Sequence, residues 1–229
     1  MKVEIGVKAL GANERQAELN RRRLLEAGWV AVNLLSSPGS GKTSLIEAVL
    51  PRLRARCDVA VVEGDVETAR DADRVAGAGG RAVQIETRGA CHLDARMVSR
   101  ALDELDLGRP ERGWGLLLIE NVGNLVCPAE YLLGEELRVV LLSTPEGDDK
   151  VAKYPEVFRT ADVVVLNKMD LAPHLDFRVE RVREDLQAVH PGVPVFPLSA
   201  RSGEGVDPWL DWLVRNARER LELRKSAGA

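Results

Sequence analysis

A phosphate-binding pattern carries the clearest chemistry in the sequence. Eight residues match the P-loop pattern G-x-x-x-x-G-K-[ST], except that a serine replaces the first glycine; they are Ser36, Ser37, Pro38, Gly39, Ser40, Gly41, Lys42 and Thr43. Gly39 and Gly41 allow the backbone torsions that turn successive N–H groups toward an anion. We expect Lys42 to reach the β- and γ-phosphates of a nucleotide and Thr43 to ligate Mg²⁺. The residues expected to surround the phosphates are Pro38, Gly39, Ser40, Gly41, Lys42, Thr43 and Ser44.

Two acidic residues follow later strands of the expected fold. Asp65 and Glu120 could hold Mg²⁺ directly or through water, although a lone carboxylate at such a position is also an ordinary helix cap or loop residue. Glu120 to Gly123 resembles the D-x-x-G switch of GTPases with Glu for Asp, so we expect the Gly123 N–H to contact a γ-phosphate. Asn124 stands where a catalytic glutamine would follow, and we identify no arginine finger. We therefore expect slow intrinsic hydrolysis, catalysed by Lys42, Asp65, Glu120 and Gly123, unless dimerisation or a partner completes the site.

A second motif indicates which base is bound. Asn167, Lys168, Met169 and Asp170 form an N-K-x-D motif after an apolar run. A carboxylate at Asp170 can accept from both N1–H and the 2-amino group of guanine, whereas adenine has neither donor. The later run Ser199, Ala200 and Arg201 resembles the S-A-K guanine loop, with Arg for Lys. The sequence therefore predicts a site for GTP and GDP. The other P-loop class considered is a small-molecule kinase, but such a kinase would use ATP, and the N-K-x-D motif argues against ATP as the nucleotide.

A thiol and imidazole group forms the third candidate site. Cys91 and His92 follow one expected strand, and Cys127 lies four residues after Gly123. Thiolate and imidazole are ligands for Ni²⁺, Zn²⁺ or copper. Three ligands leave either an open site that loads metal transiently or a site pooled by two subunits; the plain alternative is two buried cysteines and a capping histidine. We expect Cys57 to serve packing.

Short apolar runs that alternate with amphipathic segments predict the elements that position these residues. The expected strands are Val30–Leu35, Val59–Glu63, Ala82–Ile85, Leu116–Ile119, Val139–Leu142, Val163–Leu166 and Val193–Phe196. The clearest helices are expected at Asn13–Ala27, Ser44–Arg56, Asp94–Leu105, Phe177–His190 and Trp209–Leu223. This order predicts an α/β fold with a mainly parallel sheet and helices on both faces, which binds ligands at the carboxyl ends of its strands.

Composition limits the classes of protein that fit. The chain has 229 residues and a net charge of −4, which argues against a protein built around nucleic-acid phosphates. No apolar run is long enough for a membrane span, and we expect a cytoplasmic protein. We divide the chain into an N-terminal extension and helix (1–28), a nucleotide-binding domain (29–224) and a disordered tail (225–229). Asn13 and Gln16 have the form of a capping box, and Arg21 to Arg23 are either a solvated face or a partner-docking patch.

These motifs, in this order, resemble the hydrogenase nickel-incorporation GTPases of the HypB family, in the SIMIBI class of P-loop GTPases. Cys91 to Asp94 and the cysteine after the switch, Cys127, are the specific part of the resemblance; the urease nickel-delivery GTPases carry a Cys-Pro-His motif instead. The resemblance implies a GTP-dependent homodimer that binds Ni²⁺ or Zn²⁺ through Cys91, His92 and Cys127. It also implies nickel insertion into [NiFe] hydrogenase, with a HypA-type metallochaperone and the hydrogenase large-subunit precursor as partners.

Two other functions stay open on the sequence alone. One is a delivery GTPase for urease nickel or for cobalamin; the other is a metal-binding protein that uses GTP only as a structural ligand. Some members of the family carry an N-terminal Cys or His-rich stretch that binds nickel tightly. Residues 1–30 of this sequence contain neither Cys nor His, so we expect only the site next to the switch.

Overall fold

One parallel sheet organises the molecule. The computed structural model describes residues 5–65, 81–87 and 89–227. The sheet has seven strands in the order β3-β2-β4-β1-β5-β6-β7, and every neighbouring pair is parallel. The strands are β1 (Trp29–Ser36), β2 (Asp58–Asp65), β3 (Arg81–Glu86), β4 (Gly115–Glu120), β5 (Leu137–Ser143), β6 (Val163–Asn167) and β7 (Val195–Pro197). All seven expected strands are present, within two residues at each end.

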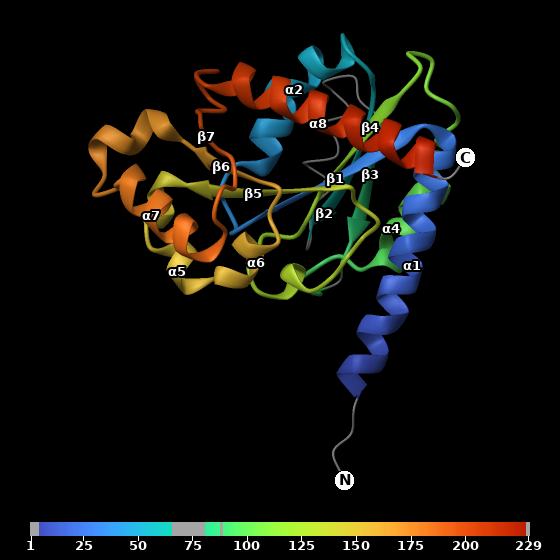
Figure 1. Ribbon diagram of the computed structural model, residues 1–229, viewed down its shortest axis with the longest axis horizontal. Helices are drawn as coiled ribbons and strands as arrows, with labels where there is room; N and C mark the ends of the chain where they lie inside the picture. The colour runs from blue at the N-terminus through green and yellow to red at the C-terminus, as the bar shows by residue number, and fades with distance from the viewer. Residues whose placement is uncertain (1–4, 66–80, 88, 228–229) are drawn as a thin grey trace.

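Helices cover both faces of the sheet (Figure 1). On one face lie α2 (Lys42–Arg54) and α8 (Val206–Ala227), which pack Leu50 and Trp209 onto the sheet. On the other face lie α1 (Ile5–Ala27) and α4 (Ala95–Leu105) at one end. At the other end of that face lie α5 (Lys150–Lys153), α6 (Pro155–Arg159) and α7 (Val179–Val189). Short 3-10 helices occupy three connections: η1 (Cys127–Ala129), η2 (Thr144–Glu146) and η3 (Met169–His174).

The central strands are buried along their whole length and are mostly apolar because helices cover both of their sides. Every residue of β1, β4, β5 and β6 is buried. Successive residues of these strands therefore pack into hydrophobic cores on opposite faces of the sheet, which is the pattern expected when helices cover both faces of a parallel sheet. The expected α/β fold, a mainly parallel sheet with helices on both faces, is confirmed.

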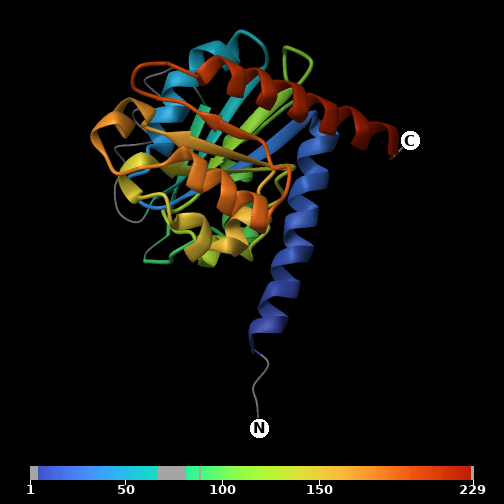
Figure 2. The same ribbon diagram turned by 60° about the vertical axis from the view of Figure 1, so that its left-hand side comes forward.

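The N-terminal helix differs from the expectation. We expected α1 to begin with a capping box at Asn13, but the helix already includes Ile5, and its first turns project beyond the sheet (Figure 2). Asn13 lies within the helix and is buried. Its side-chain amide forms hydrogen bonds with Ala95 and Leu132 and does not cap the start of α1. Ala27 ends the helix as expected, since Gly28 follows with φ +91°.

The C-terminal helix is also longer than expected. We assigned residues 225–229 to a disordered tail, yet α8 continues through Ala227. Residues 228–229 lie outside the described part. Helix α8 also begins three residues before the expected Trp209, at Val206.

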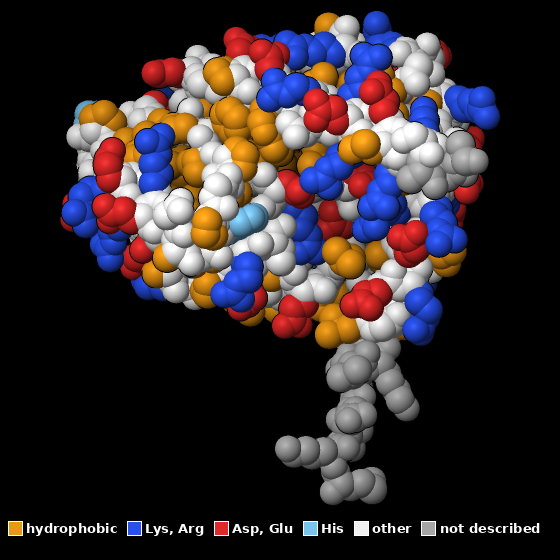
Figure 3. All heavy atoms as spheres, in the orientation of Figure 1, with side chains coloured by type: hydrophobic (Ala, Val, Ile, Leu, Met, Phe, Trp, Pro, Cys, Tyr) orange, Lys and Arg blue, Asp and Glu red, His pale blue; other side chains and the backbone are white. Residues whose placement is uncertain are grey.

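The surface carries both signs of charge. On the face shown in Figure 3, Lys and Arg side chains are interspersed with Asp and Glu side chains. Of the helices that the structure describes, none is long and apolar enough to cross a membrane.

Candidate nucleotide and metal site

The P-loop connects β1 to α2 at the carboxyl edge of the sheet. Gly39 and Gly41 have φ values of 73° and 91°, a region that residues with a side chain rarely adopt. A Cβ on Gly41 would also lie 2.7 Å from the Asn167 side-chain nitrogen. The loop borders a cavity of about 480 Å³ that is lined by Pro38, Gly39, Gly41, Lys42, Thr43, Ser44, Glu63, Gly64, Glu120, Asn121, Val122, Gly123 and Lys168. Most of the residues expected to hold phosphate therefore face one cavity.

The serine that replaces the first P-loop glycine contacts the P-loop lysine. The Lys42 ammonium is buried and donates to Ser36 Oγ at 2.8 Å. Ser36 Oγ donates in turn to the Ser37 carbonyl at 2.7 Å. The substitution thus supplies an acceptor that holds the lysine at the floor of the loop.

Threonine and carboxylate oxygens meet at the metal side of the cavity. Thr43 Oγ1 donates to Glu120 Oε1 at 2.9 Å. Glu63 is buried, stands opposite Glu120 in the β2–β4 pairing, and lines the same cavity. Hydroxyl and carboxylate oxygens are the ligands that Mg²⁺ takes, so this donor set fits the ion. Asp65 ends β2 at the same edge, but its side chain lies outside the described part of the structure.

Glu63 is a site residue that the motif search missed. The one signal for it in the sequence is a carboxylate at the end of an apolar strand, because an acid in a buried strand needs a partner.

The predicted switch glycine lies against the P-loop. A Cβ on Gly123 would come within 2.7 Å of Pro38 Cα and 2.8 Å of Pro38 N. Any larger residue would therefore displace one of the two loops. The contact places the Glu120–Gly123 segment beside the phosphate cavity.

The guanine motif is assembled from two loops. Asn167 donates to the Ser40 carbonyl (2.9 Å) and accepts from the Ala200 N–H (3.1 Å), so it joins the P-loop to the Ser199–Arg201 segment. Ser199 Oγ donates to Asp170 Oδ1 at 2.6 Å and orients that carboxylate. Lys168, with φ 61°, donates to the Gly39 carbonyl at 2.6 Å. Arg201 is exposed.

Glu146 is a second residue that the sequence did not indicate. Its Oε2 accepts from Ser40 Oγ at 2.8 Å, and also from the N–H and Oγ of Ser143 at 2.8 and 2.6 Å. A capping box of η2 therefore also fixes the P-loop to the end of β5. The Ser-x-x-Glu spacing of Ser143 and Glu146 could have predicted the capping box. No neighbouring residue in the sequence indicates the contact of Glu146 with the P-loop.

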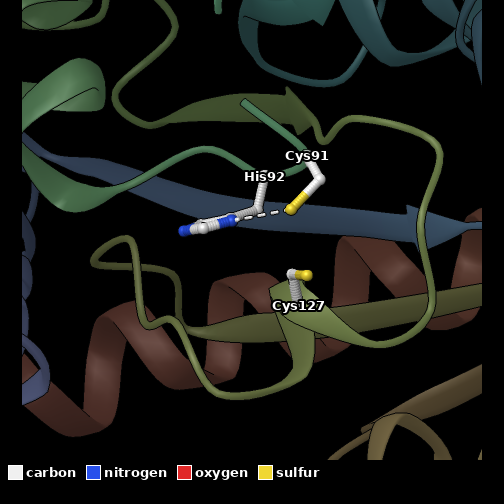
Figure 4. A group of neighbouring side chains, drawn as sticks. All are labelled: Cys91, His92 and Cys127. Atoms are coloured by element: carbon white, nitrogen blue, oxygen red, sulfur yellow. Dashed lines mark hydrogen bonds between the residues drawn. The ribbon is translucent and has the colours of Figure 1, made fainter. Parts of the chain in front are cut away.

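The predicted thiol and imidazole ligands converge (Figure 4). One ligand atom from each of Cys91, His92 and Cys127 lies within 4.8 Å of the others. Cys91 is exposed, and its Sγ lies 3.5 Å from His92 Nδ1. The His92 ring stacks on the Tyr131 ring, with centroids 4.0 Å apart. Two sulfurs and one imidazole nitrogen facing solvent can hold a soft or borderline divalent ion while leaving a coordination position open.

The pKa values of Cys91 and His92 are shifted from their usual values. A hydrogen bond with the Cys127 thiol raises the pKa of Cys91. Burial lowers the pKa of His92, which keeps the imidazole neutral and its nitrogen lone pair available. Metal binding through Cys91 must therefore release the proton of its thiol.

Comparisons with known proteins agree with this geometry. The model of the CobW/HypB/UreG nucleotide-binding domain matches residues 30–197. The chain belongs to the CobW/HypB/UreG family. It is 50% identical over 218 residues to the hydrogenase maturation factor HypB of Azotobacter vinelandii, covering 95% of this chain and 71% of that protein. It is 43% identical over 225 residues to the hydrogenase/urease maturation factor HypB of Helicobacter pylori, covering 98% and 92% of the two chains.

A solved structure of the family shows the same fold. The crystal structure of HypB from Helicobacter pylori in complex with nickel has a TM-score of 0.85 and 42% sequence identity, and covers 92% of this chain and 97% of that one. Fold and family make this chain a P-loop GTPase of the CobW/HypB/UreG family, with GTP or GDP and Mg²⁺ as its nucleotide and ion.

Two asparagines join the switch segment of this family member to the thiol cluster. Asn121 is buried, and its Oδ1 accepts from the N–H of Leu93, the residue after His92, at 3.2 Å. Asn124 Nδ2 donates to the Cys91 carbonyl at 3.3 Å. Both asparagines lie in the loop that begins at Glu120 and ends at Cys127. Cys91 and His92 are therefore held by hydrogen bonds to the segment that borders the phosphates, and Cys127 is the last residue of that segment.

The remaining candidates have simpler roles. Cys57 is buried in the core and donates to the Leu53 carbonyl, so the packing prediction is confirmed. Asp94 caps α4 by accepting from the Met97 N–H at 2.8 Å. Arg88, which precedes the thiol cluster in the sequence, lies outside the described residues. Arg21, Arg22 and Arg23 of α1 form ion pairs within the chain, with Glu18, Glu136 and Asp103.

Proposed function

We propose that this GTPase is a nickel metallochaperone, which binds Ni²⁺ at Cys91, His92 and Cys127 and uses the GTP cycle to control that binding during assembly of [NiFe] hydrogenase. The observation that carries the proposal is the convergence of these three ligand atoms on a loop that also borders the phosphates. The family relatives, one of them solved with nickel, support the same assignment.

The nucleotide residues act mainly by positioning. Backbone N–H groups of the P-loop and the Lys42 ammonium hold the phosphates, and Asp170 selects guanine. Thr43, Glu120 and Glu63 supply the oxygens for Mg²⁺; we propose Asp65 as a further ligand from its place at the end of β2. These residues would hold Mg²⁺, which would supply positive charge next to the phosphate oxygens.

The switch segment can transmit the state of the nucleotide. Loss of the γ-phosphate removes the contact expected at the Gly123 N–H and releases the loop from Glu120 to Cys127. Release of this loop also shifts Asn121 and Asn124, which hold the other arm of the cluster. The two nucleotide states then differ in nickel affinity, and such a difference is what any ligand-driven switch requires.

An open coordination position suits transfer of nickel as a cargo. Three protein ligands leave room for water, for a ligand of a second copy, or for a ligand of the acceptor. We propose a GTP-dependent homodimer in the cytoplasm, which exchanges nickel with a HypA-type metallochaperone and serves the hydrogenase large-subunit precursor. Zn²⁺ competes for the same ligands because it prefers thiolate and imidazole.

Delivery to urease is the second candidate function. The Helicobacter pylori relative is a hydrogenase/urease maturation factor, and it is 43% identical to this chain. The GTPase and metal chemistry are the same in both cases. Only the acceptor differs, so pull-down of each apo-enzyme precursor with the GTP-analogue form separates the two.

A matched pair of cysteine variants tests the nickel function. We expect Cys127→Ala to lose nickel binding. Its rate of GTP hydrolysis should stay within about twofold of wild type, because Cys127 is not among the residues that line the nucleotide cavity. Cys57→Ala, which removes a buried thiol outside the cluster, retains both properties. Equal nickel affinity in Cys127→Ala and wild type would refute the assignment.

A further inference from the structure

Helix α1 contacts both segments that carry the proposed nickel ligands, although it lies far from them in sequence. One segment runs from Cys91 to the first residue of α4, Ala95. The other begins at Cys127 and continues to Gly134. Figure 1 shows α1 beside α4, and the two helices are in contact.

Asn13 forms the first bridge. Its Oδ1 accepts from the Ala95 N–H at 2.8 Å, and its Nδ2 donates to the Leu132 carbonyl at 2.8 Å. Both ends of one amide are therefore used, one on each ligand-bearing segment. The Ala95 N–H is one of the first-turn donors of α4 that has no partner within its own helix, so Asn13 acts as a cap supplied by another helix.

Asn20 forms the second bridge, two helical turns later on the same face of α1. Its Nδ2 donates to the carbonyls of Ala95 (2.7 Å) and Leu133 (3.0 Å). Its Oδ1 accepts from Gln16 Nε2 at 3.1 Å, so the amide is held in this orientation by its own helix. Asn20 is 2% exposed, and burial of an amide costs free energy unless its hydrogen bonds are made, as they are here.

Gly134 gives evidence that does not depend on the amides. Its φ is +104°, and a Cβ there would lie 2.8 Å from the Ala17 carbonyl and 3.0 Å from the Arg21 N–H. The segment after Cys127 therefore rests directly on the α1 backbone. Tyr131, whose ring stacks on His92, lies three residues before this contact.

We propose that α1 is a positioning element of the Cys91–His92–Cys127 site. Through Asn13 and Asn20 it fixes the separation of the two ligand-bearing segments, and so sets nickel affinity. None of these α1 residues lines the nucleotide cavity, so their effect is separate from GTP hydrolysis. The inference rests on the proposed function, because it assigns a role toward the same nickel site.

The test compares nickel titrations of full-length variants. We expect Asn20→Ala and the double variant Asn13→Ala/Asn20→Ala to weaken nickel binding by about tenfold or more, as is typical when groups that orient metal ligands are removed. We expect kcat/KM for GTP to stay within twofold of wild type. Arg22→Ala on the exposed side of α1 is the matched control and binds nickel like wild type, because its side chain is 68% exposed.

Gly134→Ala is the second variant, since it displaces the segment from α1 while all bridging amides remain. It is expected to weaken nickel binding and to change the thiolate-to-nickel charge-transfer absorption. Wild-type nickel affinity in both Asn20→Ala and Gly134→Ala would overturn the inference, as would a parallel loss of GTPase activity and nickel binding. Absence of nickel binding in the wild type itself would instead refute the proposed function.

Discussion

Replacing Asn121 by alanine tests how the switch segment is joined to the nickel ligands. The side chain is 1% exposed and makes three hydrogen bonds: Oδ1 accepts from the N–H groups of Leu93 (3.2 Å) and Val122 (2.9 Å), and Nδ2 donates to Asn33 Oδ1 (3.3 Å). A net hydrogen bond contributes about 1 kcal/mol, and a buried donor left without a partner costs about 1–3 kcal/mol. Because two of the three bonds are longer than 3 Å, we expect the free energy of unfolding to fall by about 2–3 kcal/mol.

We also expect Asn121→Ala to weaken the coupling between the bound nucleotide and nickel affinity. In the wild type, nickel affinity differs between the forms bound to GDP and to a non-hydrolysable GTP analogue; in Asn121→Ala that ratio moves toward one. Denaturant unfolding measures the stability, and calorimetric nickel titration in each nucleotide state measures the ratio. Asn124→Ala is the control for stability, since the two hydrogen bonds that it removes, to the Cys91 carbonyl and from the Val126 N–H, are exposed to solvent and their loss costs about 1 kcal/mol or less. A variant with wild-type stability and a wild-type ratio would refute the argument.

Further predictions concern the base, the buried thiol and the rate. Asp170→Asn lowers GTP affinity by about 10³-fold, measured by nucleotide titration, because two guanine donors lose their acceptor. Burial raises the pKa of Cys57 from 9.0 to about 12, so between these pH values only the unfolded chain loses the thiol proton. The free energy of unfolding therefore falls with rising pH, by about 1.4 kcal/mol per unit more steeply than in Cys57→Ala, which denaturant titration at pH 9 to 11 can detect. Single-turnover hydrolysis by the monomer is slow, because the described residues that line the cavity include neither Arg nor Gln.

The sheet and the P-loop could be predicted because their signals are local. Continuous apolar strands such as Val139–Leu142 reflect burial on both faces, and Gly41 reflects a left-handed torsion that the sequence displays directly. The order of the strands then brought Cys91 and Cys127 to one edge, where the structure places their sulfur atoms together.

The contacts that join these parts could not be predicted, because their partners are distant in sequence. Asn13 matched a local capping pattern, but its partners are Ala95 and Leu132. Asn20 and Glu146 belong to residue types that are common on helix surfaces, and only the folded structure shows that both are bridges. A sequence pattern gives the period of a helix but not what lies opposite each position.

The central claim is that the loop from Glu120 to Cys127 couples the nucleotide site to the nickel site. A pair of nickel titrations of the wild-type protein tests this claim most directly. One is performed with GDP and Mg²⁺ and the other with a non-hydrolysable GTP analogue and Mg²⁺, and dimerisation is followed by light scattering at each step. We expect one nickel-binding event per subunit or per dimer that involves Cys91, His92 and Cys127, with affinities in the two states that differ by at least fivefold. Identical affinities in both states would contradict the account.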